Sequence, residues 1–538
     1  MRTIAIAIFL ASFFLVDTGT TGQTELTQTE SPSELRLRMK EEPTSLNPVD
    51  GANWSAGDIH AHVLESLLML DLDTNEWRAR LAEKWERSAD DREFTFHLRR
   101  DAQWSDGVPL TAHDVKFSFD AIFDDRFASA QMRPYYQGIE SVEVVNDFTV
   151  LFRTKTSYFG NFISCAQMSI VPRHIYGRPE DSEKLQTTIV GSGPYTLDDW
   201  QFGRRIRLKR NPKWWGWASG APESLGRPEA LSFFFITDNN VTIEMLRKGE
   251  IDFSPLTSDE YKRLSSEGAQ NHFEVSRVQN EMPKTVRSLA FNLDRPMFQD
   301  IELRRAMGEL VDRDMITKRF FHGFMIPAAG PWYVQSEYAD ASLPPQEFNP
   351  RQALERLRAR GWRDTNSNLV LDLAGRELKF TVLTFNADDL RYLTVIREDA
   401  RQIGVNIQLK LVSETVFNEA MRTGEFDAAI VSRGAAWVEF DPKVSWHSTS
   451  LPLFGYNFGR YRNPHVDTLV EQAVVEPNFE KRVPLMRELY RTLVNDAPEI
   501  FLFAERDSFY AVNKRVMRPK PTLRFDIGSA YWSVGSPR

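Results

Sequence analysis

Residues 82–119 constrain the fold of this chain more than any other stretch. They read AEKWERSADDREFTFHLRRDAQWSDGVPLTAHDVKFSF. Phe94, Phe96 and Leu98 alternate with polar residues, which predicts a half-buried strand. Asp106-Gly107 predicts a turn, and Thr111 followed by Asp114 predicts the capped start of a helix. The segment therefore predicts a strand, turn, strand, turn, helix unit, which many proteins with a β-sheet could contain.

The order of residues within this unit is more specific than its secondary structure. It resembles the family 5 extracellular solute-binding proteins, the peptide-type binding components of bacterial ABC importers, whose members read AExWxxSxDxxxxTFxLRxxxxWxDGxPxTAxDVxFS here. The segment FNLDRPMFQDIELRRAMGELVDRDMI, from Phe291, and the stretch from Trp446 to Glu471 also resemble that family. The resemblance implies an α/β fold of the two-lobed type II periplasmic binding protein class (Venus flytrap), with an extra subdomain in lobe I. It also implies a protein that binds and delivers a solute and performs no chemistry.

The resemblance and the local patterns together predict the domain organisation. Arg2 and the apolar run Ile4 to Val16, thirteen residues long, predict a signal peptide over residues 1–22, because the run is too short to span a bilayer. A polar tether is expected at 23–33. Lobe I is expected to comprise 34–57, 187–282 and 497–538, with the extra subdomain at 58–186. Lobe II is expected at 283–496, with the strand Ile500–Phe503 returning to the first lobe.

The net charge and the position of the single cysteine argue against two kinds of partner, nucleic acid and a lipid anchor. The chain has 538 residues and a net charge of −9, and no basic domain stands out, which argues against nucleic acid as a partner. The single cysteine, Cys165, lies far from the apolar run, so no lipid anchor is expected. The resemblance, together with the predicted signal peptide, implies a monomer in the periplasm with permease subunits of the inner membrane as its protein partners.

Signatures of catalysis are missing from the sequence. It contains no Gly-x-Ser-x-Gly elbow, no His-Glu-x-x-His motif, no Cys-x-x-Cys and no phosphate-binding loop. His60 and His62 would point in different directions on a helix, so they do not predict a metal site. We expect no enzymatic activity, no cofactor and no metal.

Residues 431–463 hold the strongest candidate ligand site. Arg433, Glu439 and Asp441 lie there among Trp437 and Trp446. Paired carboxylates among aromatic rings suit a ligand cation such as a peptide α-amino group, through charge-assisted hydrogen bonds and cation–π attraction. The alternative is that Asp441-Pro442 shapes a loop and that the aromatic rings are core.

Asn53 and Trp54 follow the first predicted strand, where the cleft lining of the family begins, and they complete the candidate ligand site. A core tryptophan is the alternative for Trp54.

The same region also departs from the family. Dipeptide-binding members hold the ligand amino group with an Asp where this chain has Val438, and the ligand carboxylate with an Arg where it has Leu383. Longer peptides held by main-chain pairing, and non-peptide ligands, both stay open. The sequence thus predicts capture of an oligopeptide-like solute between two lobes. The alternatives are an oligosaccharide, a metal chelate, or a role as the ligand-sensing partner of a membrane receptor.

Overall fold

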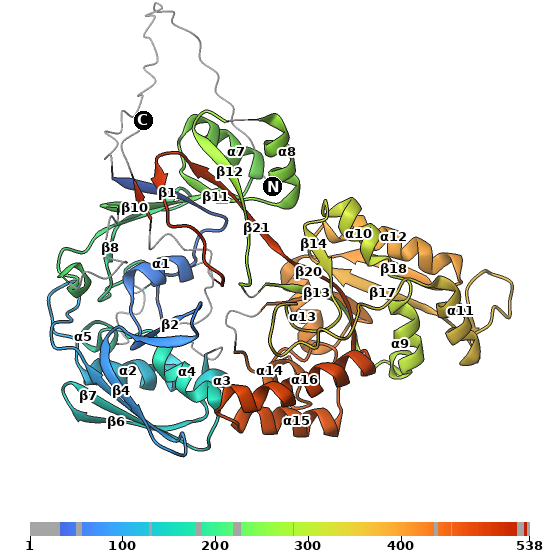
Figure 1. Cartoon of the computed structure of the whole chain (residues 1–538), viewed down its shortest axis with the longest axis horizontal. Coiled ribbons are helices and arrows are strands. Elements are labelled where there is room, and N and C mark those ends of the chain that lie inside the picture. Colours follow the sequence, from blue (N-terminus) through green and yellow to red (C-terminus); the bar gives the residue numbers. More distant parts are fainter. Residues whose placement is uncertain are drawn as a thin grey trace, which may run out of the picture.

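The computed structural model describes residues 33–49, 56–127, 132–178, 186–218, 228–268, 270–282, 284–434, 439–452, 455–524 and 532–534. Two lobes, each built on its own mixed sheet, lie side by side, and a further small sheet extends the first lobe (Figure 1). This arrangement confirms the predicted α/β fold with two lobes and an extra subdomain.

Lobe I is built on a seven-stranded sheet, and the alternating burial of β1 (Glu34–Met39) fits a strand covered mainly on one face. In sheet order its strands are β12 (Phe273–Gln279), β21 (Asp507–Asn513), β11 (Phe253–Pro255), β1, β10 (Ala230–Phe235), β9 (Arg205–Arg210) and β8 (Tyr195–Gln201). Its other elements are α1 (Gly57–Val63), η4 (Trp215–Ala218), α7 (Asn239–Lys248), α8 (Ser258–Glu267), and the paired strands β22 (Val516–Met517) and β23 (Ser533–Val534).

The extra subdomain contains the unit predicted from residues 82–119. Its sheet has the order β4 (Ala82–Arg87), β5 (Glu93–Leu98), β7 (Thr149–Thr154) and β6 (Ile139–Asn146), beside the hairpin β2 (Leu68–Asp71) and β3 (Glu76–Ala79). Its helices are α2 (Ala112–Phe123), η2 (Asp125–Phe127), α3 (Arg133–Tyr136), α4 (Phe159–Gln167) and α5 (Arg173–Tyr176). Phe94 and Phe96 are fully buried, and each contributes about 2 kcal/mol by burial. Thr111 and Asp114 form the predicted capping box.

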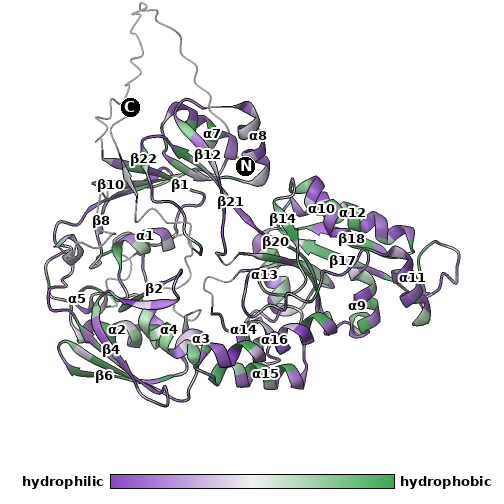
Figure 2. Cartoon of the chain, viewed as in Figure 1, coloured by the Kyte–Doolittle hydropathy of each residue, from purple (hydrophilic) through white to green (hydrophobic). Residues whose placement is uncertain are grey.

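Lobe II is built on a six-stranded sheet, and Figure 2 colours the strands at its centre mainly as hydrophobic. In sheet order these are β14 (Met325–Pro327), β20 (Glu499–Glu505), β13 (Val286–Phe291), β19 (Ala428–Arg433), β17 (Lys379–Thr384) and β18 (Asn406–Leu411). The hairpin β15 (Asp372–Leu373) and β16 (Arg376–Glu377) lies apart from this sheet. The helices are η6 (Pro296–Gln299), α9 (Ile301–Gly308), α10 (Arg313–Phe320), α11 (Pro350–Ala359), α12 (Asp389–Gln402), α13 (Glu414–Thr423), α14 (Lys443–Trp446), α15 (Pro464–Val475) and α16 (Phe479–Asp496).

The two lobes repeat one local design. Gly249 and Gly424 each end a helix in the left-handed conformation, with φ of 69° and 78°. The strand that follows each of them, β11 or β19, joins its sheet by parallel pairing. Two sheets assembled in this way are free to move as separate bodies about the segments that connect them.

Those connecting segments require a correction. The chain passes between the sheets once between β12 and β13 and again between β20 and β21. We predicted that Ile500–Phe503 returns to the first lobe, but β20 pairs with β13 and β14 in lobe II. The return therefore lies at Glu505–Asp507 rather than at residue 497. β20 is buried along almost its whole length, and an apolar strand of that kind fits the interior of either sheet.

The boundary of the subdomain also differs from the prediction. Helix α1 lies within the predicted subdomain range, yet Ile59 and Val63 pack in the core of lobe I with Leu35 and Tyr195. The helix ends at Val63, and the carboxylate of the next buried polar residue, Glu65, accepts hydrogen bonds from the indoles of Trp214 and Trp215. This buried acceptor connects the start of the subdomain to lobe I.

Candidate ligand-binding site

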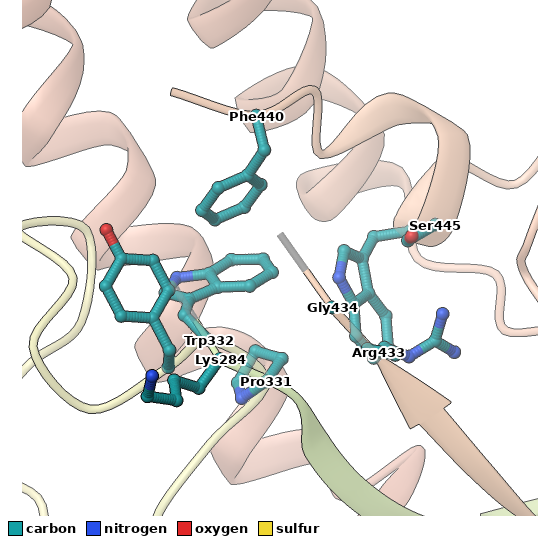
Figure 3. A pocket seen from close by; sticks show the side chains of 9 residues that line it. Lys284, Pro331, Trp332, Arg433, Gly434, Phe440 and Ser445 are labelled. Atoms are coloured by element: carbon teal, nitrogen blue, oxygen red, sulfur yellow. The ribbon is translucent and has the colours of Figure 1, made fainter. Parts of the chain in front are cut away.

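A small pocket lies where the chain crosses between the lobes. We call it the crossing pocket, and its cavity volume is about 50 Å³. It is lined by Lys284, Pro331, Trp332, Tyr333, Arg433, Gly434, Phe440, Ser445 and Trp446 (Figure 3). This space is larger than one water molecule needs, so the pocket can receive part of a bound solute.

Aromatic rings form the body of the crossing pocket. The ring centroid of Trp332 is 4.9 Å from that of Phe440 and 6.3 Å from that of Trp446. Trp332 and Trp446 belong to one buried cluster that also contains residues of α15 and α16. Since packing on several sides fixes these rings, the pocket is largely pre-formed.

Two polar atoms of these rings have no protein partner. The indole nitrogens of Trp332 and Trp446 are buried, and neither has a hydrogen-bond partner among the described residues. A buried N–H without an acceptor costs about 1–3 kcal/mol. Both residues line the crossing pocket, so an acceptor group bound there could remove this cost.

Lys284 brings a positive charge to the crossing pocket. It is 6% exposed, and its ammonium donates one hydrogen bond, of 2.9 Å, to the hydroxyl of Ser508. Ser508 belongs to β21 in lobe I, so this bond joins the lobes at the crossing. Burial raises the pKa of the nearby Glu505, and the charges of Arg287 and Lys284 act in the opposite direction, so a carboxylate lies close enough to Lys284 to interact with its charge.

Arg433 lines the same pocket, but its charge is already paired. It forms an ion pair with Glu499, a residue of β20 with a buried side chain, and it donates a 3.0 Å hydrogen bond to the carbonyl of Tyr456. Its guanidinium lies 4.6 Å from the ring centroid of Trp446, and in Figure 3 it points away from Lys284. The structure therefore brings the predicted site residues Arg433 and Trp446 together. Arg433 lines the pocket, and its charge is neutralised by Glu499.

The two predicted carboxylates lie elsewhere, where the subdomain meets lobe II. Glu439 accepts a 3.0 Å hydrogen bond from the Asn75 amide and pairs with Arg482. Asp441 accepts hydrogen bonds of 2.7 Å from the Tyr158 hydroxyl and 2.7 Å from the Lys443 amide. Burial raises the pKa of Asp441. Each carboxylate thus has protein donors, and its expected role in binding a ligand cation stays a prediction.

We call this second meeting place the distal contact, and Arg482 is its centre. The guanidinium of Arg482 is fully buried, donates to the Tyr338 hydroxyl, and lies 4.1 Å from the ring centroid of Phe159 in the subdomain. Figure 1 shows α3 and α4 beside α15 and α16 at this end of the molecule. Tyr158, Phe159, Asn75, Glu439, Asp441 and Arg482 make up the distal contact.

The remaining predicted site residues, Asn53, Trp54 and Trp437, lie outside the described residues. Sequence reasoning missed Lys284, Trp332 and Tyr333. The run Pro331-Trp332-Tyr333 was a visible aromatic signal, but nothing in its spacing connected it with Arg433 or Trp446. No group of three or more His, Cys, Asp or Glu side chains that could hold a metal occurs in the part of the chain that the structure describes.

Two sheets in separate lobes, two crossings between them and a small aromatic pocket at the crossing define a two-lobed solute-binding protein of the periplasmic type II class. The family described as "Bacterial extracellular solute-binding proteins, family 5 Middle" matches residues 76–452, which is more than half of the chain. The chain belongs to this family.

Two related proteins match this chain over most of the length of both sequences. The chain is 24% identical over 478 residues to the oligopeptide-binding protein AppA of Bacillus subtilis, covering 86% of this chain and 84% of the relative. It is 24% identical over 517 residues to the periplasmic oligopeptide-binding protein OppA of Salmonella typhimurium, covering 89% and 87%.

Solved structures share the fold. AppA from Bacillus subtilis in complex with a nonapeptide matches with a TM-score of 0.77 at 23% identity, covering 93% of this chain and 99% of that one. NikZ from Campylobacter jejuni in complex with Ni(L-His) matches with a TM-score of 0.77 at 22% identity, covering 93% and 99%. Within the described residues, none of the helices has the length and apolar character needed to cross a bilayer.

Proposed function

We propose that this protein is the substrate-binding component of an ABC importer, which captures an oligopeptide-like solute between its lobes and delivers it to a membrane permease. The observation that carries the proposal is the pre-formed aromatic pocket at the point where the chain crosses between two separate sheets. The lining residues belong to lobe II, and one of them, Lys284, donates a hydrogen bond to Ser508 of lobe I. A ligand bound there that also contacts lobe I stabilises the closed arrangement by its differential affinity for that state.

Membership of the solute-binding family and the names of the relatives support this proposal. Binding and delivery require no chemical step, and we propose that the protein is not an enzyme. We further propose that residues 1–22 are a signal peptide and 23–33 a tether, and that the mature protein acts in the periplasm as a monomer. Its protein partners are the permease subunits, and no nucleic acid is involved.

A non-peptide solute is the second candidate. Proteins of the same fold have been solved with Ni(L-His) and with agropinic acid, so the fold is compatible with small chelates and other acidic solutes. The crossing pocket can receive part of either kind of solute. A sensing role, in which the loaded protein contacts a receptor, uses the same pocket and the same closure.

Native mass spectrometry of protein purified from its own host, before and after mild denaturation, tests the proposal. A series of released masses spaced by amino-acid residues is the expected result for a peptide binder. One discrete non-peptide mass would overturn the peptide assignment while keeping solute binding. A protein that carries nothing and shows no thermal shift with peptide pools contradicts import of peptides.

A further inference from the structure

Helix α4 of the subdomain contributes to two hydrophobic cores. Phe162, Cys165 and Ala166 are buried in the core of the subdomain itself. Phe159 and Ile163 are four residues apart, so they share one side of the helix. Phe159 is 5% exposed and belongs to a buried cluster formed mainly by lobe II, and Ile163 packs against the same cluster. The wide apolar surface of α4 is thus divided between its own subdomain and lobe II, whose helices α15 and α16 lie beside it (Figure 1).

The part of lobe II that receives Phe159 is held together by lobe II alone. Arg482 pairs with Glu439 and donates hydrogen bonds of 2.9 Å to the Tyr338 hydroxyl and 2.6 Å to the Glu476 carbonyl. We call these four residues the socket. The Phe159 ring centroid lies 4.1 Å from the buried guanidinium of Arg482, in a cation–π contact. Withdrawal of this ring would expose one face of the guanidinium to water without breaking any of the polar contacts within the socket.

The other polar links of the distal contact can be replaced by water. The Tyr158 hydroxyl donates to Asp441 at 2.7 Å and the Asn75 amide donates to Glu439 at 3.0 Å, and all four residues are half-buried. The chain itself passes between the lobes elsewhere, between β12 and β13 and between β20 and β21, so the distal contact is non-covalent. It can therefore form and separate as the lobes rotate about the two crossings.

We infer that the distal contact is a latch, in which Phe159 of the subdomain enters the socket of lobe II and holds the lobes closed. Its contacts are made between protein groups, so the latch contributes the same free energy whatever solute is bound. The inference rests on the proposed function and adds a determinant of affinity that lies outside the lining of the crossing pocket. The apparent affinity for any solute is then proportional to the fraction of protein in which the latch is closed.

Distances between spin labels in the full chain, after removal of co-purified solute, test the latch. The labels are attached through Asp120→Cys on α2 and Glu480→Cys on α16, two exposed positions on opposite sides of the distal contact. The native Cys165 is fully buried and stays unlabelled. Protein without further changes should give one short-distance population. Phe159→Ala should add a longer-distance population and raise the ratio of open to closed protein at least about tenfold, because burial of a phenyl ring is worth more than that factor.

Phe202→Ala is the matched control, because it removes a phenyl ring that is 69% exposed between β8 and β9 of lobe I. It should keep the distance distribution of the unchanged protein. The latch is overturned if Phe159→Ala also keeps that distribution, or if the unchanged protein is already in the longer-distance population. A lower melting temperature of Phe159→Ala without a longer-distance population likewise contradicts the latch, because the distal contact is then a permanent joint.

Ile163→Asp decides the question if Phe159→Ala fails to fold. Ile163 is half-buried where α4 packs against lobe II, so a carboxylate at this position reaches water when the latch opens and is desolvated when it closes. This variant should also raise the ratio of open to closed protein at least about tenfold. An unchanged ratio in a folded Ile163→Asp protein would overturn the latch.

Solute binding gives an independent readout, with individual peptides drawn from the pools of the thermal-shift assay as the probe. Every peptide that binds the wild type should bind Phe159→Ala more weakly by one common factor, equal to the fall in the closed fraction. Factors that differ from peptide to peptide would overturn the latch, because they require contact between Phe159 and the solute. If the wild type binds no peptide, the peptide function is wrong, and the distance measurement, which uses no solute, still decides the latch.

Discussion

Two of the places where the lobes meet differ in how completely their polar groups are paired. At the distal contact, Glu439 and Asp441 each have protein donors, and Arg482 has protein acceptors. At the crossing pocket, the indole N–H groups of Trp332 and Trp446 have no acceptor among the described residues. The comparison shows that a charged side chain in a predicted site, such as Glu439 or Asp441, does not identify a ligand contact by its charge alone, because it can be paired within the protein. Paired groups join the lobes at the distal contact, whereas the two indoles at the crossing pocket contribute packing without a hydrogen bond to the described residues.

The largest effect is expected from Arg482→Met, which tests whether the distal contact is structural. The guanidinium is fully buried and pairs with Glu439, so its loss leaves a carboxylate and the Tyr338 hydroxyl without their donor. We expect the free energy of unfolding to fall by about 3 kcal/mol, measured by urea denaturation.

The control for this prediction lies on the same helix. Arg487→Met removes an exposed guanidinium that donates to the carbonyl of Glu337, and it should cost less than about 0.5 kcal/mol. Equal losses in the two variants would mean that burial and pairing at the distal contact do not distinguish Arg482.

Tyr158→Phe tests the contact between the subdomain and lobe II more selectively. It removes the hydroxyl that donates to Asp441 at 2.7 Å and keeps the ring. A hydrogen bond to a charged group contributes about 1.5–3 kcal/mol, and Asp441 is half-buried, so we expect a loss of about 1.5 kcal/mol. Hydrogen exchange of the amides in α4 and α14 should become faster.

Tyr261→Phe is the matched control, because it removes a hydroxyl in α8 of lobe I, away from the distal contact. Its exchange rates in α4 and α14 should equal those of the wild type. If Tyr158→Phe also leaves these rates unchanged, the hydroxyl does not hold the lobes together.

Asn75→Gly should have a smaller effect. Asn75 has a φ of 56° and donates to Glu439 at 3.0 Å, and glycine tolerates this backbone conformation without strain. The variant therefore isolates the lost hydrogen bond, worth about 1 kcal/mol in the same urea assay. A double-mutant cycle with Glu439→Ala should give a coupling energy of that size, and additive single effects would show that the two side chains act independently.

The sequence predicted local units well, because their determinants are neighbours in the chain. The alternating burial of Phe94, Phe96 and Leu98 and the capped helix start at Thr111 and Asp114 appear as predicted. The assignment of Ile500–Phe503 to the first lobe was wrong, since an apolar strand carries no signal for the sheet it joins.

The candidate site was harder to predict than the fold. Arg433 and Trp446 were identified from the aromatic segment around them, and both line the crossing pocket. Lys284 and Trp332 come from distant segments that only the folded chain brings together. Glu439 and Asp441 were chosen for their charge, but a sequence does not reveal whether a carboxylate has a partner. Arg482 in α16 and Tyr158 immediately before α4 supply two of those partners, and neither segment has a pattern that distinguishes these residues.

The pH dependence of the distal contact is expected to be small and can be assigned to one residue. Burial raises the pKa of Asp441 above its ordinary value of 3.8, so the folded state binds more protons than the unfolded state between these two pKa values. Stability from this group is therefore present at low pH and is lost as pH rises through that window. The difference in unfolding free energy between the wild type and Asp441→Asn should fall as pH increases from about 4. A difference that rises over this range would contradict the raised pKa.

The smallest change in stability is expected from Lys284→Met, which tests the other half of the comparison. The Lys284 ammonium is nearly buried and has one neutral hydrogen-bond partner, so the cost of desolvating its charge opposes the gain from that bond. Methionine has a similar length and carries no charge, and we expect the unfolding free energy of the ligand-free protein to change by less than about 0.5 kcal/mol. Urea denaturation of Lys284→Met and of Arg482→Met measures the difference between their losses in unfolding free energy. Equal losses in the two variants would make Lys284 a structural residue and remove the distinction between the two meeting places.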